Sequence, residues 1–199
     1  MDVPPLDIRD ISIIDALPVY DMPPVTSVLS VGCGEGRLDF HLAQLGYAVH
    51  ATDIIPYKTW QDVITSPGSV RFSTADIFTL DSFPVSSAPV VICSEVLEHI
   101  PGYALAFKNL LALATTRLII TVPWRTSFNV RDIPPPVGHC NHWDDKASKN
   151  FRDIHEFAEL CCPFQFCVSK MRTKPRDVKS NQYDYLLIVD KRQQWCTTP

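Results

Sequence analysis

Three glycines stand at alternate positions in VLSVGCGEGRLDF, residues 28–40, directly after an apolar run. The chain has only seven glycines, so this cluster marks a place where the backbone must be free of side chains. The apolar run shows no polar alternation, which is typical of a strand buried on both faces of a parallel sheet. The segment after the glycines repeats leucines at helical spacing and ends at Gly46. The junction therefore predicts a strand, a tight turn and a helix in succession.

The same alternation continues along the chain. Apolar and β-branched runs predict seven strands, at 27–31, 47–53, 69–76, 89–95, 117–123, 164–170 and 183–191. Helical patterns predict helices after the glycines and at 8–17, 57–65, 103–114 and 151–161. No helix separates the last two strands, so the last one is expected to enter antiparallel. The predicted fold is α/β, a Rossmann-like doubly wound seven-stranded sheet that is mostly parallel with the last strand antiparallel.

The 17 prolines divide the chain into segments. Residues 1–26 are predicted to be an N-terminal lead-in, and residues 124–149 a long loop after the fifth strand. Such long loops are uncommon unless they are functional, and this one leaves the sheet at the edge where the glycines lie. We expect residues 1–199 to form a single domain with 124–149 as its substrate-side loop.

Composition narrows the class of protein. The net charge of −4 gives no overall attraction to nucleic acid. No apolar run is long enough to cross a bilayer, and the N-terminus lacks the pattern of a signal peptide, so no membrane insertion is expected. The seven cysteines are odd in number and form no C-x-x-C pair, which favours reduced thiols and a cytoplasmic protein. The oligomeric state is not predicted.

The glycine spacing indicates the kind of ligand. Dinucleotide-binding turns follow G-x-G-x-x-G, whereas here the pattern is G-x-G-x-G with Glu35 among the glycines. A carboxylate would repel a pyrophosphate but tolerate an ammonium group. Asp53 ends the second predicted strand, where a carboxylate accepts hydrogen bonds from both ribose hydroxyls.

These residues resemble a family. VLSVGCGEGRLDFHLAQLGYAVHATD looks like the first motif and the following acid of class I S-adenosylmethionine-dependent methyltransferases. The resemblance extends to ADIF (75–78) and VVICSEVLEHI (90–100), and its motifs cover residues 27 to 123. It implies S-adenosylmethionine as cofactor and a seven-stranded sheet.

The resemblance also implies roles for single residues. The turn would cradle the methionine part, the acids would hold the ribose and the adenine amino group, and apolar side chains would lie against the ring. In chain order the implied cofactor-binding residues are Val31, Gly32, Cys33, Gly34, Gly36, Asp53, Ile54, Asp76, Ile77, Ser94 and Glu95. For Asp76 the alternative is an ordinary turn residue.

The E-x-x-E-H stretch after the fourth strand suggests a metal. In a helical turn, Glu95 would lie on the side of Glu98 and His99, where these three could bind Mg or Zn. His139 could complete the set, and His142 is an alternative. A similar stretch occurs in ubiquinone-biosynthesis O-methyltransferases and small-RNA 2′-O-methyltransferases. It also occurs in methyltransferases without metal, where these residues are structural.

Candidate catalytic residues are Glu95, His99, His139 and His142, because an oxygen acceptor needs a base or a metal. Trp143, beside the last two histidines, could stack on a substrate ring. A run of lysines and arginines at 169–180 could receive phosphate or carboxylate, or be a solvated hairpin tip.

The sequence thus predicts an S-adenosylmethionine-dependent methyltransferase, acting on an oxygen of a small molecule or an RNA end. Two alternatives stay open. One is a nucleotide-dependent oxidoreductase, against which the glycine spacing and Glu35 argue. The other is a non-catalytic methyltransferase-like module that binds partners in a larger assembly.

Overall fold

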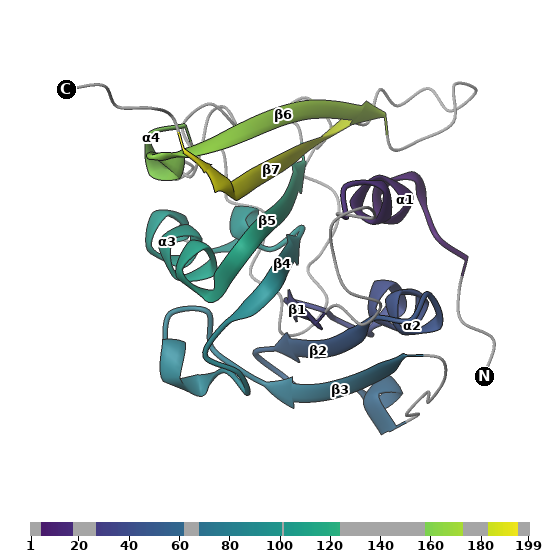
Figure 1. The fold of residues 1–199 in the computed structure, drawn as a ribbon. Helices are drawn as coiled ribbons and strands as arrows, with labels where there is room; N and C mark the ends of the chain where they lie inside the picture. The colour runs from purple at the N-terminus through teal and green to yellow at the C-terminus, as the bar shows by residue number, and fades with distance from the viewer. Residues whose placement is uncertain are drawn as a thin grey trace, which may run out of the picture.

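A seven-stranded mixed sheet forms the centre of the protein (Figure 1). The computed structural model describes residues 5–17, 27–61, 68–100, 102–123, 158–172 and 183–194. The strands are β1 (Ser27–Val31), β2 (Ala48–Asp53), β3 (Ser69–Thr74), β4 (Ala88–Ser94), β5 (Ala114–Pro123), β6 (Phe164–Arg172) and β7 (Tyr183–Gln194). Their order is β3-β2-β1-β4-β5-β7-β6. All pairs from β3 to β5 are parallel, and β7 is antiparallel to both β5 and β6, as predicted.

Helices cover both faces of the sheet (Figure 1). The α-helices are α1 (Ile8–Asp15), α2 (Arg37–Gln44), α3 (Tyr103–Leu113) and α4 (Ala158–Cys161). The 3-10 helices are η1 (Lys58–Gln61), η2 (Leu80–Ser82) and η3 (Leu97–His99). On one face, Phe107 and Leu110 of α3 pack on Leu118 of β5. On the other, Ile13 of α1 and Leu42 of α2 share a second core cluster.

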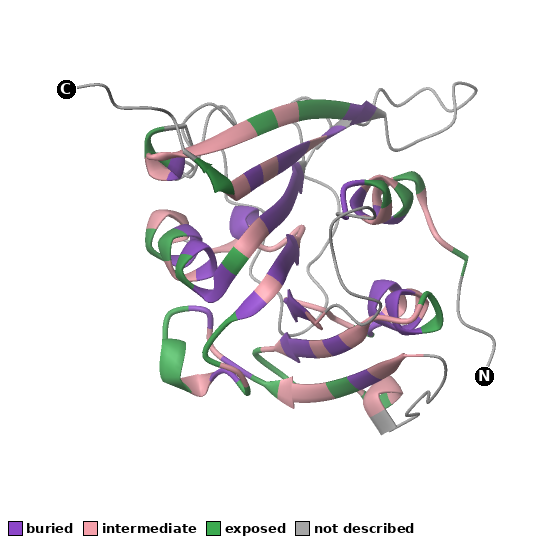
Figure 2. Cartoon of the chain, in the orientation of Figure 1, coloured by how far each residue is buried: buried purple, intermediate pink, exposed green. Residues whose placement is uncertain are grey.

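Burial follows the two-sided cover. Four of the five residues of β1 and five of the seven residues of β4 are buried. Figure 2 shows the buried colour concentrated on the central strands and on the helix faces turned toward them. The expectation from the unbroken apolar runs is therefore confirmed.

Several element boundaries differ from the predictions. Of the helix predicted at 57–65, the structure describes only the 3-10 turn at 58–61, and of the one at 151–161 only 158–161. β5 begins at Ala114 because α3 passes into it directly, so the helix ends one residue earlier than predicted. The short turn η2 carries no periodic apolar signal and was not predicted, and of the helical turn considered for 95–99 only η3 is helical.

α1 begins at a capping box. The Asp7 carboxylate accepts a hydrogen bond from the Asp10 amide at 2.9 Å, and the Asp10 carboxylate accepts one from the Asp7 amide at 3.1 Å. Two otherwise unpaired backbone donors are thereby satisfied. This box fixes where the helix starts and brings Arg9, in its first turn, to the edge of the sheet that bears the glycine turn.

A glycine is needed at position 36, the last of the three glycines in the turn, for two reasons. Gly36 has a φ of 82°, and a Cβ built there would lie 2.6 Å from the Phe72 ring. Gly46 has a φ of 99° but nothing within 4 Å of its built Cβ. Comparing them separates backbone strain from steric overlap.

We expect Gly46→Ala to cost about 1–2 kcal/mol of unfolding free energy from strain alone. Gly36→Ala should cost roughly 1–3 kcal/mol more, because the Phe72 ring must move. Urea denaturation of both variants measures the difference. Equal losses would show that Phe72 does not press on this position.

Candidate functional site

The site lies where the strand order reverses. β1 is flanked by β2 on one side and β4 on the other, and the chain leaves β1 and β4 in connections on either side of this point. Open α/β sheets bind ligands outside the carboxyl ends of such strands. In this protein that place holds the glycine turn after β1, the end of β2 and the turn after β4.

Backbone hydrogen bonds tie the glycine turn to β2. The amides of Gly32 and Cys33 both donate to the Thr52 carbonyl, at 2.8 and 3.0 Å. The amide of Gly36 donates back to the Cys33 carbonyl at 3.0 Å, which closes the turn. The turn is thus held by main-chain atoms alone at these points.

The three glycines differ in what surrounds them. All have positive φ, 74° at Gly32, 55° at Gly34 and 82° at Gly36. A Cβ at Gly32 would overlap Val96, whereas one at Gly34 would meet nothing within 4 Å. Gly34 therefore faces open space, and its backbone is accessible to a ligand.

Asp53 is oriented by two amides. Its Oδ2 accepts from Gly34 N at 2.9 Å and its Oδ1 from Ile54 N at 2.7 Å. Each carboxylate oxygen keeps further lone-pair capacity for a donor from a ligand. The predicted ribose-binding acid thus lies directly beside the glycine turn.

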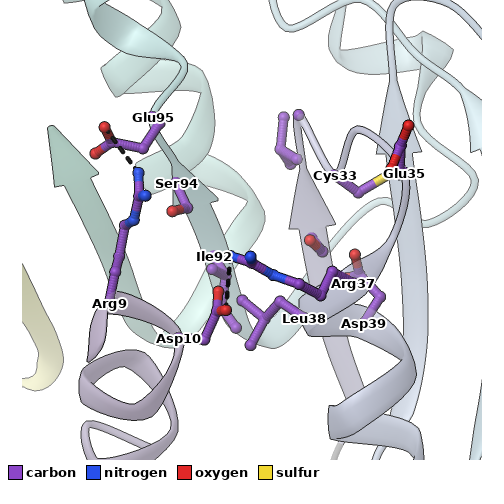
Figure 3. A pocket seen from close by; sticks show the side chains of 13 residues that line it. Arg9, Asp10, Cys33, Glu35, Arg37, Leu38, Asp39, Ile92, Ser94 and Glu95 are labelled. Carbon is purple, nitrogen blue, oxygen red and sulfur yellow. Dashed lines mark ion pairs between the residues drawn. The ribbon is translucent and has the colours of Figure 1, made fainter. Parts of the chain in front are cut away.

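Two cavities meet at Gly32 and Glu95. The larger, about 360 Å³, extends between α1 and α2 (Figure 3) and is lined by Arg9, Asp10, Ser30, Val31, Gly32, Cys33, Glu35, Arg37, Leu38, Asp39, Ile92, Ser94 and Glu95. The smaller, about 190 Å³, is lined by Gly32, Gly34, Asp53, Ile54, Ile55, Tyr57, Glu95, Val96, His99 and Ile100. The larger cavity is lined by many charged side chains. The lining of the smaller cavity is mostly apolar, and β2 contributes one carboxylate to it, that of Asp53.

Ion pairs cross the larger cavity. Figure 3 shows Arg9 reaching from α1 to Glu95, with Nη1 2.9 Å from Oε2, and Arg37 of α2 reaching Asp10, with Nη2 2.7 Å from Oδ2. Arg9 Nε also lies 3.7 Å from the Asp184 carboxylate of β7. α1 is thereby connected to β4, β7 and α2 around the cavity.

Burial raises the pKa of several carboxyl groups here. It raises the pKa of Glu95, against the opposing effect of Arg9, and that of Asp184 in the same way. It raises the pKa of fully buried Asp39 to about 7, and one oxygen of Asp39 has no hydrogen-bond partner. Four carboxyl side chains but only two guanidinium groups line the cavity, which therefore favours a ligand that brings positive charge.

Glu95 has an unusual backbone. Its φ is 58°, in the left-handed region that a residue with a side chain rarely adopts, and its amide donates to the Thr121 carbonyl at 3.0 Å. Such strain is retained where the surrounding structure holds a residue in place. Glu95 is thus directed between the two cavities.

The E-x-x-E-H stretch does not form the expected helical turn. Only Leu97–His99 is helical, and the backbone at Glu95 turns away from it. Glu95 pairs with Arg9, whose positive charge opposes a cation at the same carboxylate. Among the described residues no group of three His, Cys, Asp or Glu side chains is placed to hold a metal. Glu95, Glu98 and His99 are thus not grouped as metal ligands in this part of the chain, and the predicted set with His139, which lies outside the described residues, stays a prediction.

Glu98 and His99 differ in their exposure to the site. Glu98 is 7% exposed, burial raises the pKa of its carboxyl group well above the usual range, and neither oxygen accepts a hydrogen bond. His99 lines the smaller cavity, and its Nε2 lies 3.6 Å from Glu98 Oε1. Of the two, only His99 can face a ligand.

Asp76 and Ile77 do not line either of these cavities. Asp76 Oδ1 accepts from the Phe78 amide at 2.9 Å, as a turn residue does, and Ile77 is 9% exposed within the core. Their adenine-binding role stays a prediction. Ile54 is 63% exposed and lines the smaller cavity with Asp53, and its contact with the adenine also stays a prediction.

Some candidates lie outside the described residues, namely His139, His142, Trp143 and most of the 169–180 run. Conversely, sequence reasoning missed Arg9, Arg37 and Asp184. The D-x-x-D capping pattern of Asp7–Asp10, which encloses Arg9, is a signal that could have indicated a helix start there. Nothing local indicated the partners of Arg9 after β4 and on β7.

Comparisons with known proteins agree with this geometry. Residues 29–114 match the model of the methyltransferase domain family. The 2-methyl-6-phytyl-1,4-hydroquinone methyltransferase of Synechocystis sp. is 30% identical over 135 residues, 66% of this chain and 41% of that protein. The chain thus spans well under half the length of this relative.

Solved structures share the fold. Magnesium protoporphyrin IX methyltransferase from Synechocystis PCC 6803, with bound SAM, matches at a TM-score of 0.59 and 23% identity, over 92% of this chain and 78% of that one. A putative S-adenosylmethionine-dependent methyltransferase from Listeria monocytogenes matches at 0.62 and 16%, over 91% and 97%. A TehB-like SAM-dependent methyltransferase from Corynebacterium glutamicum matches at 0.57 and 17%, over 92% and 87%.

This sheet order, with a bare turn after β1 and an acid ending β2, defines the class I S-adenosylmethionine-dependent methyltransferase fold. The chain shares that fold with the solved methyltransferases, and residues 29–114 match the model of the methyltransferase domain family. No helix among the described residues has the length and apolar character needed to span a membrane.

Asp39 gives a pH-dependent prediction. Burial raises its pKa from 3.8 to about 7, so the folded state prefers the protonated form and the free energy of unfolding falls as pH rises between these values. We expect Asp39→Asn to be more stable than the wild type at pH 8, by as much as about 4 kcal/mol. The two should converge below pH 4.

Urea denaturation across pH 4–8 measures this. Asp81→Asn, at an exposed aspartate of η2, is the control and should keep the wild-type pH profile. An Asp39→Asn profile parallel to that of the wild type would contradict the prediction.

Proposed function

We propose that this chain transfers a methyl group from S-adenosylmethionine to an oxygen of a small molecule. The observation that carries the proposal is the Asp53 carboxylate beside Gly34, where an open, side-chain-free backbone meets an acid held by two amides. A nucleoside with free ribose hydroxyls fits that pair. The G-x-G-x-G spacing and Glu35, in the wall of the larger cavity, disfavour a dinucleotide.

The charged cavity fits the other end of the cofactor. An α-amino acid carries one carboxylate and one ammonium group, and Arg9 and Glu95 offer the opposite charges 2.9 Å apart. We infer that Arg9 receives the carboxylate and Glu95 the ammonium, in exchange for their mutual ion pair. The excess of carboxyl groups around them suits a ligand that also carries a sulfonium.

When bound, the cofactor supplies an electrophilic methyl carbon. The chain's own residues then have to orient the acceptor and accept its proton. His99 lines the smaller cavity beside Asp53 and is proposed as the base, whereas Glu95 is held by Arg9 and is proposed to bind. A contribution from His139 or His142 remains a proposal.

The names of the relatives support one class of methyl acceptor. The related proteins are named for methylation of a hydroquinone and of magnesium protoporphyrin IX, which are small molecules. This supports a small-molecule acceptor over an RNA end. A non-catalytic binding module is the alternative, and it differs in showing no methyl transfer.

Ligand binding tests the cofactor assignment. We expect S-adenosylhomocysteine to bind, and Asp53→Asn to weaken it roughly tenfold to a hundredfold, since hydrogen bonds to a charged group contribute about 1.5–3 kcal/mol. Arg9→Met should weaken S-adenosylhomocysteine but not 5′-methylthioadenosine, which lacks the amino acid end. Isothermal calorimetry measures all of these.

Asp81→Asn is again the control and should bind as the wild type does. NAD is the competing ligand. If NAD binds and S-adenosylhomocysteine does not, the proposed function is wrong and the oxidoreductase hypothesis is supported instead.

Transfer tests the chemistry. We expect His99→Gln to lower the rate of methyl transfer to catechols or carboxylates at least tenfold, without changing the dissociation constant of S-adenosylhomocysteine, because general-base contributions are about 10²–10⁴-fold. Labelled cofactor measures the rate. An unchanged rate would remove His99 as the base, and loss of the rate on adding EDTA would restore a metal.

A further inference from the structure

The glycine turn receives two side chains from η1. Trp60 Nε1 donates to the Gly34 carbonyl at 2.8 Å, and Thr59 Oγ1 donates to the Glu35 carbonyl at 2.9 Å. Neither residue lines the two cavities. They therefore act on the backbone of the turn from outside the site.

Hydrogen bonds fix the peptide groups on both sides of Gly34. The amide on its N-terminal side donates to Asp53 Oδ2, and the carbonyl on its C-terminal side accepts from Trp60. Nothing beyond its two chain neighbours packs on the side of Gly34 where a Cβ would point, since a Cβ built there meets no other atom within 4 Å. A glycine in open space can rotate its peptide groups at little cost, so these hydrogen bonds decide its conformation.

Trp60 is itself held by aromatic contacts. Its ring stacks on Phe72 of β3 with centroids 5.2 Å apart and planes 12° apart. Phe72 in turn packs edge-on against Phe40 of α2 at 5.4 Å. The ring contacts with Phe72 of β3, and through it with Phe40 of α2, thus hold the indole N–H in place.

We propose that Trp60, with Thr59 beside it, is a positioning residue that holds the Gly34 backbone in the orientation in which Asp53 binds the ribose of the cofactor. The inference rests on the proposed function. Without the indole donor, the peptide group after Gly34 is free to turn and the φ and ψ of Gly34 change together. The Gly34 amide, in the preceding peptide group, then loses its alignment with Asp53, and the carboxylate loses one of its two anchors. Cofactor binding is weakened although no residue in contact with the cofactor has changed.

Trp60→Phe tests this, because it keeps a ring over Phe72 and removes only the donor. We expect the dissociation constant of S-adenosylhomocysteine to rise roughly threefold to tenfold, which is the effect of one hydrogen bond. Thr59→Val should act in the same direction, and Thr59→Ser, which keeps the hydroxyl, should bind as the wild type does.

A double-mutant cycle separates positioning from general destabilisation. In the Asp53→Asn background, Trp60→Phe should have a clearly smaller effect, because the amide it orients no longer serves a carboxylate. Equal effects in both backgrounds, or an unchanged dissociation constant in Trp60→Phe, would overturn the inference.

A measurement without ligand makes the outcome independent of the proposed function. We expect hydrogen exchange of the Gly34 amide, followed by NMR, to be faster in Trp60→Phe than in the wild type, while core amides of β1 and β4 are unchanged. Unchanged Gly34 exchange would overturn the inference even if S-adenosylhomocysteine binds. Faster exchange in a chain that binds no S-adenosylhomocysteine would leave the anchoring role of Trp60 standing and reject the cofactor.

Discussion

The hydrogen bonds between β2 and the glycine turn are the interaction on which the site depends. A turn without side chains has nothing to pack, so its shape must come from main-chain partners. Thr52 supplies a carbonyl to two amides, and Asp53 supplies a carboxylate to a third. The register that pairs Val31 with Thr52 brings these partners to the turn, so the pairing of β1 with β2 builds the binding site directly.

Charge organises the opposite end of the site. Arg9 and Arg37 face a larger number of buried or half-buried carboxyl groups, several with raised pKa values. Removing either guanidinium would leave carboxylates without compensation, which is more costly than losing the pair's own attraction. The same imbalance means that a cationic ligand relieves repulsion as it binds. Stability and ligand preference therefore share one origin in this cavity.

Much of the fold could be predicted because it depends on residue patterns within short segments of the sequence. The apolar runs located all seven strands, and the missing helix before the last one indicated its direction. The glycine turn and Asp53 were found because backbone freedom and a strand-end acid have clear sequence signals. The Arg9–Glu95 pair was not, since it joins segments far apart in the chain. The reversed backbone at Glu95 was also missed, because its φ is imposed by tertiary contacts and E-x-x-E-H reads as an ordinary helical turn.

The position of α1 has a consequence for biosynthesis. This helix packs on β6 and β7, and Arg9 reaches Asp184 of β7. Ribosomes make α1 long before β6 and β7, so during translation the helix lacks these two strands of its packing surface, and Arg9 lacks its acidic neighbour on β7. The contact between Arg9 and Asp184 can form only after β7 has emerged from the exit tunnel. A nascent chain halted before that strand would present the β1–β2 turn complete but α1 without its contacts to the last two strands.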